Sequence, residues 1–402
     1  MKKIFEKIIE GILMISGTVT TLTVLLIIFF LFKEGIGLFG KSPTEEGFTV
    51  AVNRNNPVNE LSTDQIKNIF DQNIHNWNEV GGNNDSIILF RMDDLFNYYT
   101  EEELSGIDTN MNLLTSKIDE VIDRNKGIIA FISSKEIPQN PNSKLIHIKA
   151  IGLGSFFGGK EWFPTAQPVA QFGVYPLLMG TLWVSLLAIL IALPFGLATA
   201  IYMAEIASPG VRGVLKPVIE LLAGIPSVVY GFFGLIIVVP LVQQIFKLPV
   251  GETGLTGSII LAIMALPTII TVAEDAIRGT PRSVKEASLA LGASHWQTIY
   301  RITIPYASSG ITAAVILGIG RAIGETMAVL MVTGNAAVVP HSILEPMRTI
   351  PATIAAELGE AAKGSLHYDA LFALGCILFI ITMLVNITVQ MISGKRTKNR
   401  LR

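Results

Sequence analysis

Residues 278–305 read RGTPRSVKEASLALGASHWQTIYRITIP and lie between two long apolar runs. Pro281 suits the first turn of a helix, and Ser283–Leu291 is rich in helix-forming residues. Gly292 is a residue type that commonly ends helices. The stretch therefore predicts a helix, a glycine turn and a further structured segment, and it is too polar to cross a membrane.

The second part of this stretch predicts a short helix over Ser294–Arg301. This helix would bring Trp296 and the pair Ile299 and Tyr300 to a surface, and Pro305 would stop it where the next apolar run begins. Two helices that expose apolar side chains between membrane spans indicate a docking site for a partner.

The composition places most of the chain in an apolar environment. Of 402 residues, 50% are hydrophobic and only 15% charged, against about 25% charged in soluble domains. We expect a polytopic α-helical membrane protein with six transmembrane helices, in contact with membrane lipid. The first, within residues 1–33, lies in an uncharged run that is long for a signal peptide. The expected spans are Gly11–Phe32, Tyr175–Met203, Val214–Val242, Leu255–Val272, Ala307–Val332 and Leu366–Met391.

An acidic block interrupts this apolar frame between the first and second spans. Residues 33–171 hold 12 Lys and Arg against 19 Asp and Glu, a balance of −7, whereas the remainder has a balance of +5. We predict a small α/β domain over 43–150 and a linker over 151–172. A transmembrane domain over 173–394 and a basic tail over 395–402 follow. The overall charge of −2 argues against a nucleic-acid partner.

The distribution of Lys and Arg predicts the orientation. If the N-terminus is cytoplasmic, the inner segments carry 14 of these residues and the short outer loops carry 3. Positive charge favours the cytoplasmic side, so both termini and residues 278–305 are expected inside. The acidic domain is then expected on the outside of a bacterial inner membrane.

The spacing in the cytoplasmic stretch resembles the "EAA" loop of ATP-binding-cassette importer permeases. The marked positions of that loop correspond to Glu286, Ala287, Gly292, Ile302 and Pro305. In that family the first loop helix inserts into a groove of the ATPase subunit. The resemblance implies an ATPase dimer as partner and assigns these five residues to coupling.

Arg321 and Glu325 lie deep in the fifth expected span, four residues apart, and so would share one helix face. A charge at this depth is costly, and a guanidinium group offers a planar set of donors suited to phosphate. We predict that Arg321 lines an anion path and that Glu325 orients it; an ion pair between spans is the structural alternative. Glu274, Asp275 and Arg278 close the fourth span and are candidates for gating, or simply form a solvated helix end.

From about Trp162 onward the chain resembles PstC-type phosphate permeases, most clearly over Leu221–Gly234, Gly318–Thr326 and Arg348–Asp369. The resemblance implies phosphate as the substrate. It also implies a PstA-type sister permease as heterodimer partner and a periplasmic phosphate-binding protein.

The outer domain resembles part of phosphate-binding periplasmic proteins over Leu61–Gly82 and Gly127–Phe131. In those proteins an Arg followed by a Ser-Gly-Thr-type turn holds phosphate. Here Arg91 is followed by Met-Asp-Asp-Leu-Phe, and carboxylates repel anions. We expect a docking or gating role for this domain rather than phosphate binding of that kind.

The sequence predicts no catalytic residues, metal ligands or cofactor. It has no Gly-x-x-x-x-Gly-Lys-Ser/Thr motif, so ATP hydrolysis is assigned to a partner. Two alternatives stay open: a permease for another oxyanion, or a membrane phosphate sensor with an outer ligand domain.

Overall fold

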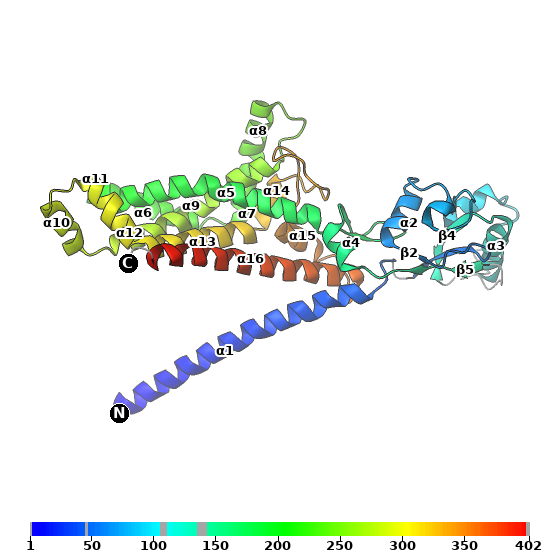
Figure 1. Cartoon of the computed structure of the whole chain (residues 1–402), viewed down its shortest axis with the longest axis horizontal. Coiled ribbons are helices and arrows are strands. Elements are labelled where there is room, and N and C mark those ends of the chain that lie inside the picture. Colours follow the sequence, from blue (N-terminus) through cyan, green and yellow to red (C-terminus); the bar gives the residue numbers. More distant parts are fainter. Residues whose placement is uncertain (1, 45–46, 105–110, 135–142, 399–402) are drawn as a thin grey trace. The chain divides into compact units, whose positions relative to one another are not determined.

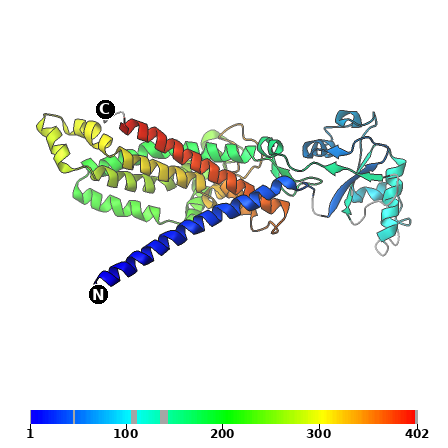
Figure 2. The same ribbon diagram turned by 60° about the horizontal axis from the view of Figure 1, so that its bottom comes forward.

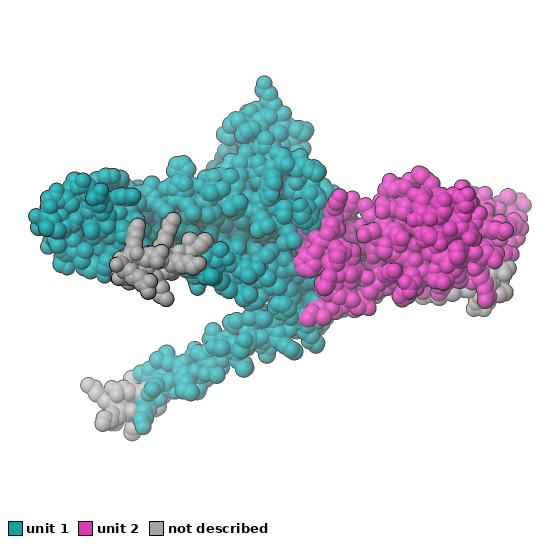
Figure 3. Space-filling model, in the orientation of Figure 1, with its two compact units in different colours: residues 1–35, 175–402 teal, residues 36–174 magenta. Residues whose placement is uncertain are grey.

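The computed structural model describes residues 2–44, 47–104, 111–134 and 143–398, and the chain forms two compact units (Figure 3). Unit 1 comprises residues 1–35 and 175–402, and unit 2 comprises residues 36–174. Residues 399–402 of the predicted basic tail lie outside the described residues.

Unit 1 is helical throughout its regular structure (Figure 1). Its elements are α1 (Lys2–Ile36), α5 (Tyr175–Ile201), η6 (Tyr202–Ile206), α6 (Pro209–Ala223), α7 (Ser227–Phe233), η7 (Gly234–Val238), α8 (Val239–Phe246), α9 (Gly254–Arg278), α10 (Arg282–Ala290), α11 (His295–Thr298), η8 (Ile299–Thr303), α12 (Ile304–Tyr306), α13 (Ser308–Gly324), α14 (Met327–Val332), α15 (Ile350–Glu357) and α16 (Leu366–Lys398). The elements η6, η7 and η8 are π-helical.

Five helical segments within the described residues are long and apolar enough to cross a membrane, or six if one bent pair forms a span. The five are Ile9–Gly40, Tyr175–Ile206, Ser227–Phe246, Gly254–Arg278 and Leu366–Met391; the bent pair is His295–Tyr306 with Ser308–Gly324, at 69°. A multi-pass helical membrane protein is therefore confirmed.

The predicted span Val214–Val242 is wrong as a continuous helix. Helix α6 ends at Ala223, and Pro226 precedes α7, so the span in this region is Ser227–Phe246. Gly224 and Pro226 break the helix, because proline lacks the N–H that a continuing helix requires. Helix α6 is a separate element that carries several charged residues.

The predicted span Ala307–Val332 is also interrupted. Helix α13 ends at Gly324, Glu325 adopts an extended conformation with φ −71° and ψ 135°, and α14 begins at Met327. Arg321 and Glu325 therefore do not share one helix face, which corrects the expectation from their spacing.

The centre of unit 1 is formed by α5, α9 and α13, and glycines allow these helices to approach closely. A Cβ atom on Gly196 of α5 would lie 2.8 Å from the side chain of Ile269 on α9. One on Gly318 of α13 would lie 2.7 Å from the same side chain. Ile269 is thus packed between the two neighbouring helices, as expected where small residues mediate helix contacts in membranes.

Helix α1 packs against α16 through its last residues. The Phe30 and Phe372 rings lie 5.6 Å apart, and a Cβ atom on Gly35 would lie 3.0 Å from Cys376. Both views place the start of α1 and the end of α16 toward the end of unit 1 that carries α10 and α11 (Figure 1 and Figure 2).

Unit 2 is a three-layer α/β domain. Its elements are η1 (Gly37–Gly40), β1 (Phe48–Asn53), β2 (Glu60–Leu61), α2 (Thr63–Phe70), η2 (Trp77–Val80), β3 (Ile88–Phe90), η3 (Met92–Asn97), α3 (Met111–Arg124), β4 (Ile128–Ser133), β5 (Ser143–Leu145), β6 (His147–Ile148), α4 (Leu153–Gly158), β7 (Trp162–Phe163) and β8 (Gln171–Phe172). The main sheet has the order β3-β4-β1-β5, with β1 antiparallel to β4 and β5 and β3 parallel to β4.

Alternation along β1 explains the layers of unit 2. Val50 and Val52 pack in one buried cluster with Ile66 of α2, whereas Ala51 packs in another with Ile118 of α3. Successive strand residues face opposite sides, so each face of the sheet is covered by one helix. Residues 151–172, predicted as a linker, contribute α4, β7 and β8 to this unit.

Candidate transport pathway and coupling surface

The predicted helix–glycine–helix arrangement of residues 278–305 is present in the structure. Helix α10 follows Pro281, and Gly292 adopts a left-handed conformation with φ +86°. The N–H of Gly292 donates to the carbonyl of Leu289 at 2.9 Å, and the N–H of Ala293 donates to that of Ser288 at 3.2 Å. These paired bonds satisfy the last carbonyls of the helix, and glycine adopts the required conformation without a Cβ penalty.

This loop exposes a row of residues available to a partner. Glu286 and Ala287 are exposed, and Leu291 is 90% exposed. Trp296 and Tyr300 are 64% and 68% exposed, as predicted. Ile299, which was expected beside Tyr300 on the surface, is buried, because π-helical η8 turns it toward the protein.

The helical segment does not stop at Pro305. Pro305 is near the start of α12, where a missing N–H is tolerated, and the chain bends by 69° between Tyr306 and Ser308. Ile302 and Pro305 are both half-buried at this bend. Both therefore lie where the loop joins the following span, while Glu286 and Ala287 face outward.

Glu274 forms the most heavily compensated buried charge of unit 1. Its side chain is 1% exposed, and one carboxylate oxygen, Oε1, lies 2.7 Å from Arg212 and 3.6 Å from Arg278. Lys216 lies 3.2 Å from the other oxygen, Oε2, as an ion pair without hydrogen-bond geometry. Glu274, Arg212, Lys216, Asp275 and Arg278 are called the Glu274 cluster below.

Asp275 extends the Glu274 cluster toward solvent. Lys216 donates a hydrogen bond to its Oδ1 at 3.0 Å. This bond, together with the neighbouring Glu274 carboxylate, holds the pKa of Lys216 above its ordinary value against the opposing effect of burial. The structure thus brings together Glu274, Asp275 and Arg278. Sequence reasoning missed that Arg212 and Lys216, four residues apart on α6, complete the cluster.

Arg321 is the opposite case. Its Nε is buried and has no hydrogen-bond partner, and the described residues supply no ion pair to its guanidinium group. Glu325 lines a pocket with Thr181, Ser185 and Thr349 instead. The hydroxyl of Ser185 donates to the carbonyl of Ala322, the residue after Arg321, at 3.4 Å. The predicted Arg321–Glu325 pair is therefore absent from the described residues.

Sequence reasoning also missed a second cluster, formed by Arg348, Glu357 and His367. Glu357 accepts from Arg348 at 2.7 Å and pairs with His367 at 2.8 Å. Within the described residues, no group of three or more His, Cys, Asp or Glu is placed to hold a metal ion.

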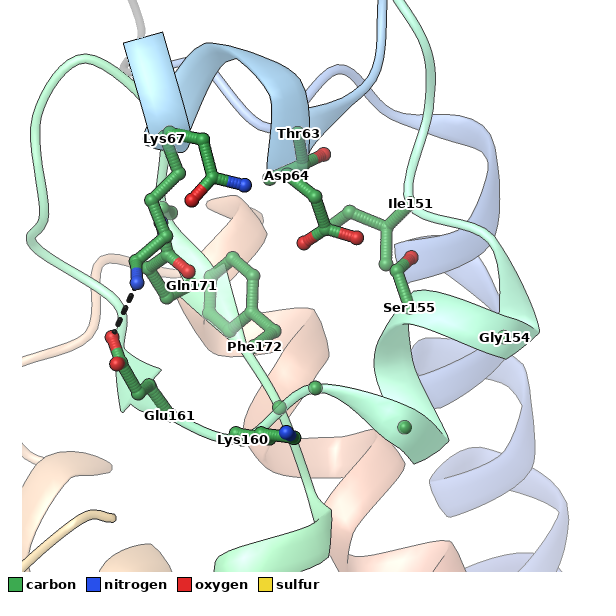
Figure 4. A pocket seen from close by; sticks show the side chains of 15 residues that line it. Thr63, Asp64, Lys67, Ile151, Gly154, Ser155, Lys160, Glu161, Gln171 and Phe172 are labelled. Atoms are coloured by element: carbon green, nitrogen blue, oxygen red, sulfur yellow. Dashed lines mark ion pairs between the residues drawn. The ribbon is translucent and has the colours of Figure 1, made fainter. Parts of the chain in front are cut away.

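Unit 2 contains a cleft of about 420 Å³ between the start of α2 and the segment from α4 to β8 (Figure 4). Two lysines and two acids line it: Lys67 pairs with Glu161 at 3.0 Å, and Lys160 and Asp64 also contribute. Because positive and negative groups balance, the lining does not favour a multiply charged anion.

Arg91 of unit 2 is not presented to an anion in the way the resemblance would require. Its N–H donates to the Asp94 carboxylate at 2.8 Å, and its guanidinium group lies 5.7 Å from the centre of the Phe70 ring. Amide groups at a helix start bind anions when they are free, but here Asp94 already accepts from one.

Comparison with known families decides what the helical unit is. Residues 192–398 match the family described as the inner membrane component of binding-protein-dependent transport systems. The chain belongs to this family. The permease is thus a non-enzymatic membrane component, and membership implies an ATPase and a binding protein as partners. Residues 38–182 match the PBP superfamily domain, which agrees with the predicted resemblance of the domain that forms unit 2.

The similarity between this permease and the following relatives extends over most of each relative's length. A probable ABC transporter permease protein, YqgH, of Bacillus subtilis is 41% identical over 60% of this chain and 78% of its own. The phosphate transport system permease protein PstC of Mesorhizobium japonicum is 38% identical over 58% and 75%. A chain of the MetNI methionine ABC transporter covers 56% of this permease and 94% of that chain at 19% identity. The TM-score of this match is 0.42.

Proposed function

We propose that this permease carries inorganic phosphate across a bacterial inner membrane, driven by ATP hydrolysis in a separate subunit. The observation that carries the proposal is the buried Nε of Arg321, which has no hydrogen-bond partner among the described residues. A buried donor without a partner is costly, so its presence calls for a ligand that pairs with it at some stage. Phosphate pairs well with guanidinium, and the PstC relatives are named as phosphate permeases.

Glu325 has a different role in this proposal from the one its spacing suggested. It lies in the extended segment between α13 and α14 and lines one pocket with Thr181, Ser185 and Thr349. A carboxylate near the path weakens the overall attraction for an anion, and a path must release its ion as well as bind it.

The ATPase dimer docks on α10 and α11 in this proposal. Glu286 and Ala287 provide the exposed helix surface, Gly292 the turn, and Ile302 and Pro305 the connection to the next span. Glu274, Asp275 and Arg278 stabilise the same end of the bundle, where their opening and closing would gate it. A PstA-type sister permease completes the path, and a periplasmic phosphate-binding protein delivers the substrate.

Both termini are cytoplasmic in this proposal. The charge distribution favours this orientation, and α1 begins and α16 ends toward the end of unit 1 that carries α10 (Figure 1 and Figure 2). Unit 2, inserted after α1, is then extracytoplasmic.

The test is Arg321→Gln in the complete transporter, with phosphate uptake measured in cells that lack other phosphate importers. Losing a charge-assisted hydrogen bond of about 1.5–3 kcal/mol predicts a roughly ten- to hundredfold fall in uptake. The ATPase should still co-purify. Lys363→Gln, at an exposed cation, is the matched control and should transport normally.

Unchanged phosphate uptake in Arg321→Gln would refute the pathway role. If the wild-type transporter takes up another oxyanion without phosphate, and Arg321→Gln lowers that uptake, the substrate is that oxyanion and not phosphate. If the wild-type chain moves no anion but alters a response to phosphate, the sensor alternative holds.

A further inference from the structure

The attachment of α10 to the rest of unit 1 rests on very few side chains. Every residue of α10 is at least partly exposed, and the chain joins it to α9 through Gly279, Thr280 and Pro281. Ser288 bonds to Thr298 at 3.0 Å, but this contact stays within the loop. Lys285 makes the one ion pair from α10 to a membrane-spanning segment that the described residues contain; its partner is Glu205.

The Lys285–Glu205 pair is shielded from solvent. The side chain of Lys285 is 21% exposed and that of Glu205 is 6% exposed. Exposed ion pairs contribute little because water screens them, whereas removing one partner of a shielded pair leaves an uncompensated charge. This pair therefore fixes the position of α10, unlike an exposed pair such as Lys149 with Glu60.

Glu205 lies in η6, the π-helical turn that ends the span Tyr175–Ile206. A π-helical turn within a membrane helix is a recurrent feature of functional regions. The lysine of α10 thus engages the end of a long span, rather than another part of its own loop.

The other half of the same span contacts the neighbourhood of Arg321. Ser185 donates to the carbonyl of Ala322 at 3.4 Å, and Thr181 accepts from the N–H of Ile350 at 2.9 Å. Ser185 and Glu205 are separated by 20 residues, or roughly 30 Å along a helix. One helix therefore links the docking loop to the region of the candidate anion site.

We propose that Lys285 and Glu205 form a coupling strut that passes movement of α10 to α5 and so to the region of Arg321. The pair positions α10 and touches neither phosphate nor ATP. When the ATPase displaces α10, the shielded ion pair makes α5 follow. This inference rests on the proposed function, since it requires an ATPase docked on α10.

The test uses the full transporter in proteoliposomes, with phosphate transported and ATP hydrolysed measured together. Glu205→Gln and Lys285→Gln should each keep the ATPase bound and hydrolysing, while phosphate transported per ATP falls about tenfold. The charge-exchanged double variant Glu205→Lys with Lys285→Glu should restore at least half of the wild-type ratio. Glu60→Gln, which breaks an exposed pair, should leave the ratio unchanged.

Three results would overturn the strut. They are an unchanged ratio in both single variants, loss of the ATPase from them, and failure of the exchanged pair to restore a lowered ratio. If a single variant folds poorly, the charge-exchanged double variant still tests the proposal, because it restores opposite charges at residues 205 and 285. Failure of the proposed function looks different: the wild-type chain would then bind no ATPase or transport no phosphate.

Discussion

Glu274 and Arg321 are both charged and both have buried polar atoms, but their surroundings differ completely. Three cations surround the Glu274 carboxylate at 2.7 to 3.6 Å. The buried Nε of Arg321 has no hydrogen-bond partner among the described residues. The charge of Glu274 is compensated by neighbouring side chains, whereas the buried Nε of Arg321 is a donor without an acceptor among the described residues.

This difference separates an architectural charge from a candidate ligand-binding charge. Arg212 and Lys216 come from α6 and Glu274 from α9, so the Glu274 cluster holds two helices together. Arg321 holds no second helix through an ion pair in the described chain. Buried polar groups are nearly always satisfied, and an exception within a membrane span is a functional candidate.

The largest expected effect is a loss of stability when Glu274, the compensated charge, is replaced. Glu274→Gln leaves Arg212 as a partly buried cation without its carboxylate partner and leaves Lys216 paired with Asp275 alone, which should cost about 3–5 kcal/mol of unfolding free energy. Thermal unfolding of the detergent-purified chain measures this. Glu220→Gln, on an exposed residue of α6, is the control and should change stability by less than about 0.5 kcal/mol.

The pH dependence of this contribution follows from Lys216. Its pKa is raised in the folded state, so the stability it adds is present below the ordinary lysine pKa of about 10.4. That stability is lost only as pH rises through the higher folded value. The difference between wild type and Glu274→Gln should therefore persist at neutral pH. A difference near zero there would contradict the assigned role of the cluster.

Local signals in the sequence predicted the helix–glycine–helix arrangement of residues 278–305. Pro281, Gly292 and the Ser294–Gln297 capping box affect only the backbone of neighbouring residues. Their effects can therefore be recognised in the sequence without knowledge of the tertiary structure. The same holds for the Ser62–Gln65 capping box that begins α2 in unit 2.

Long-range contacts and helix breaks could not be predicted in the same way. Arg212 lies 62 residues from Glu274, and nothing in the spacing of either indicates the other. The spacing of Arg321 and Glu325 suggested a shared face only because a continuous helix was assumed, and the break after Gly324 removes that assumption. Apolar composition likewise concealed the break around Pro226.

A smaller effect on stability is expected when Arg321, the uncompensated charge, is replaced. Arg321→Gln removes no ion pair, so its unfolding free energy should stay within about 1 kcal/mol of wild type even though transport falls. The same thermal unfolding assay applies, with Arg212→Gln as the matched arginine that does lose its pair. If Arg321→Gln is as unstable as Arg212→Gln, the guanidinium group of Arg321 is structural and the comparison fails.

The smallest effect on stability is expected from replacing Arg91. This replacement tests whether an arginine in the domain that resembles phosphate-binding proteins is structural, like Arg212, or binds the anion, as proposed for Arg321. Its guanidinium group is exposed and stacks on Phe70, and Asp94 occupies its N–H. Arg91→Ala should lower stability by only about 0.5–1 kcal/mol through the lost cation–π contact, and phosphate uptake should not change. Titration of phosphate into the purified full chain should give the same affinity for Arg91→Ala as for wild type. A loss of phosphate affinity would mean that unit 2 binds the anion despite Asp93 and Asp94, since electrostatic repulsion by these carboxylates is the reason for expecting none.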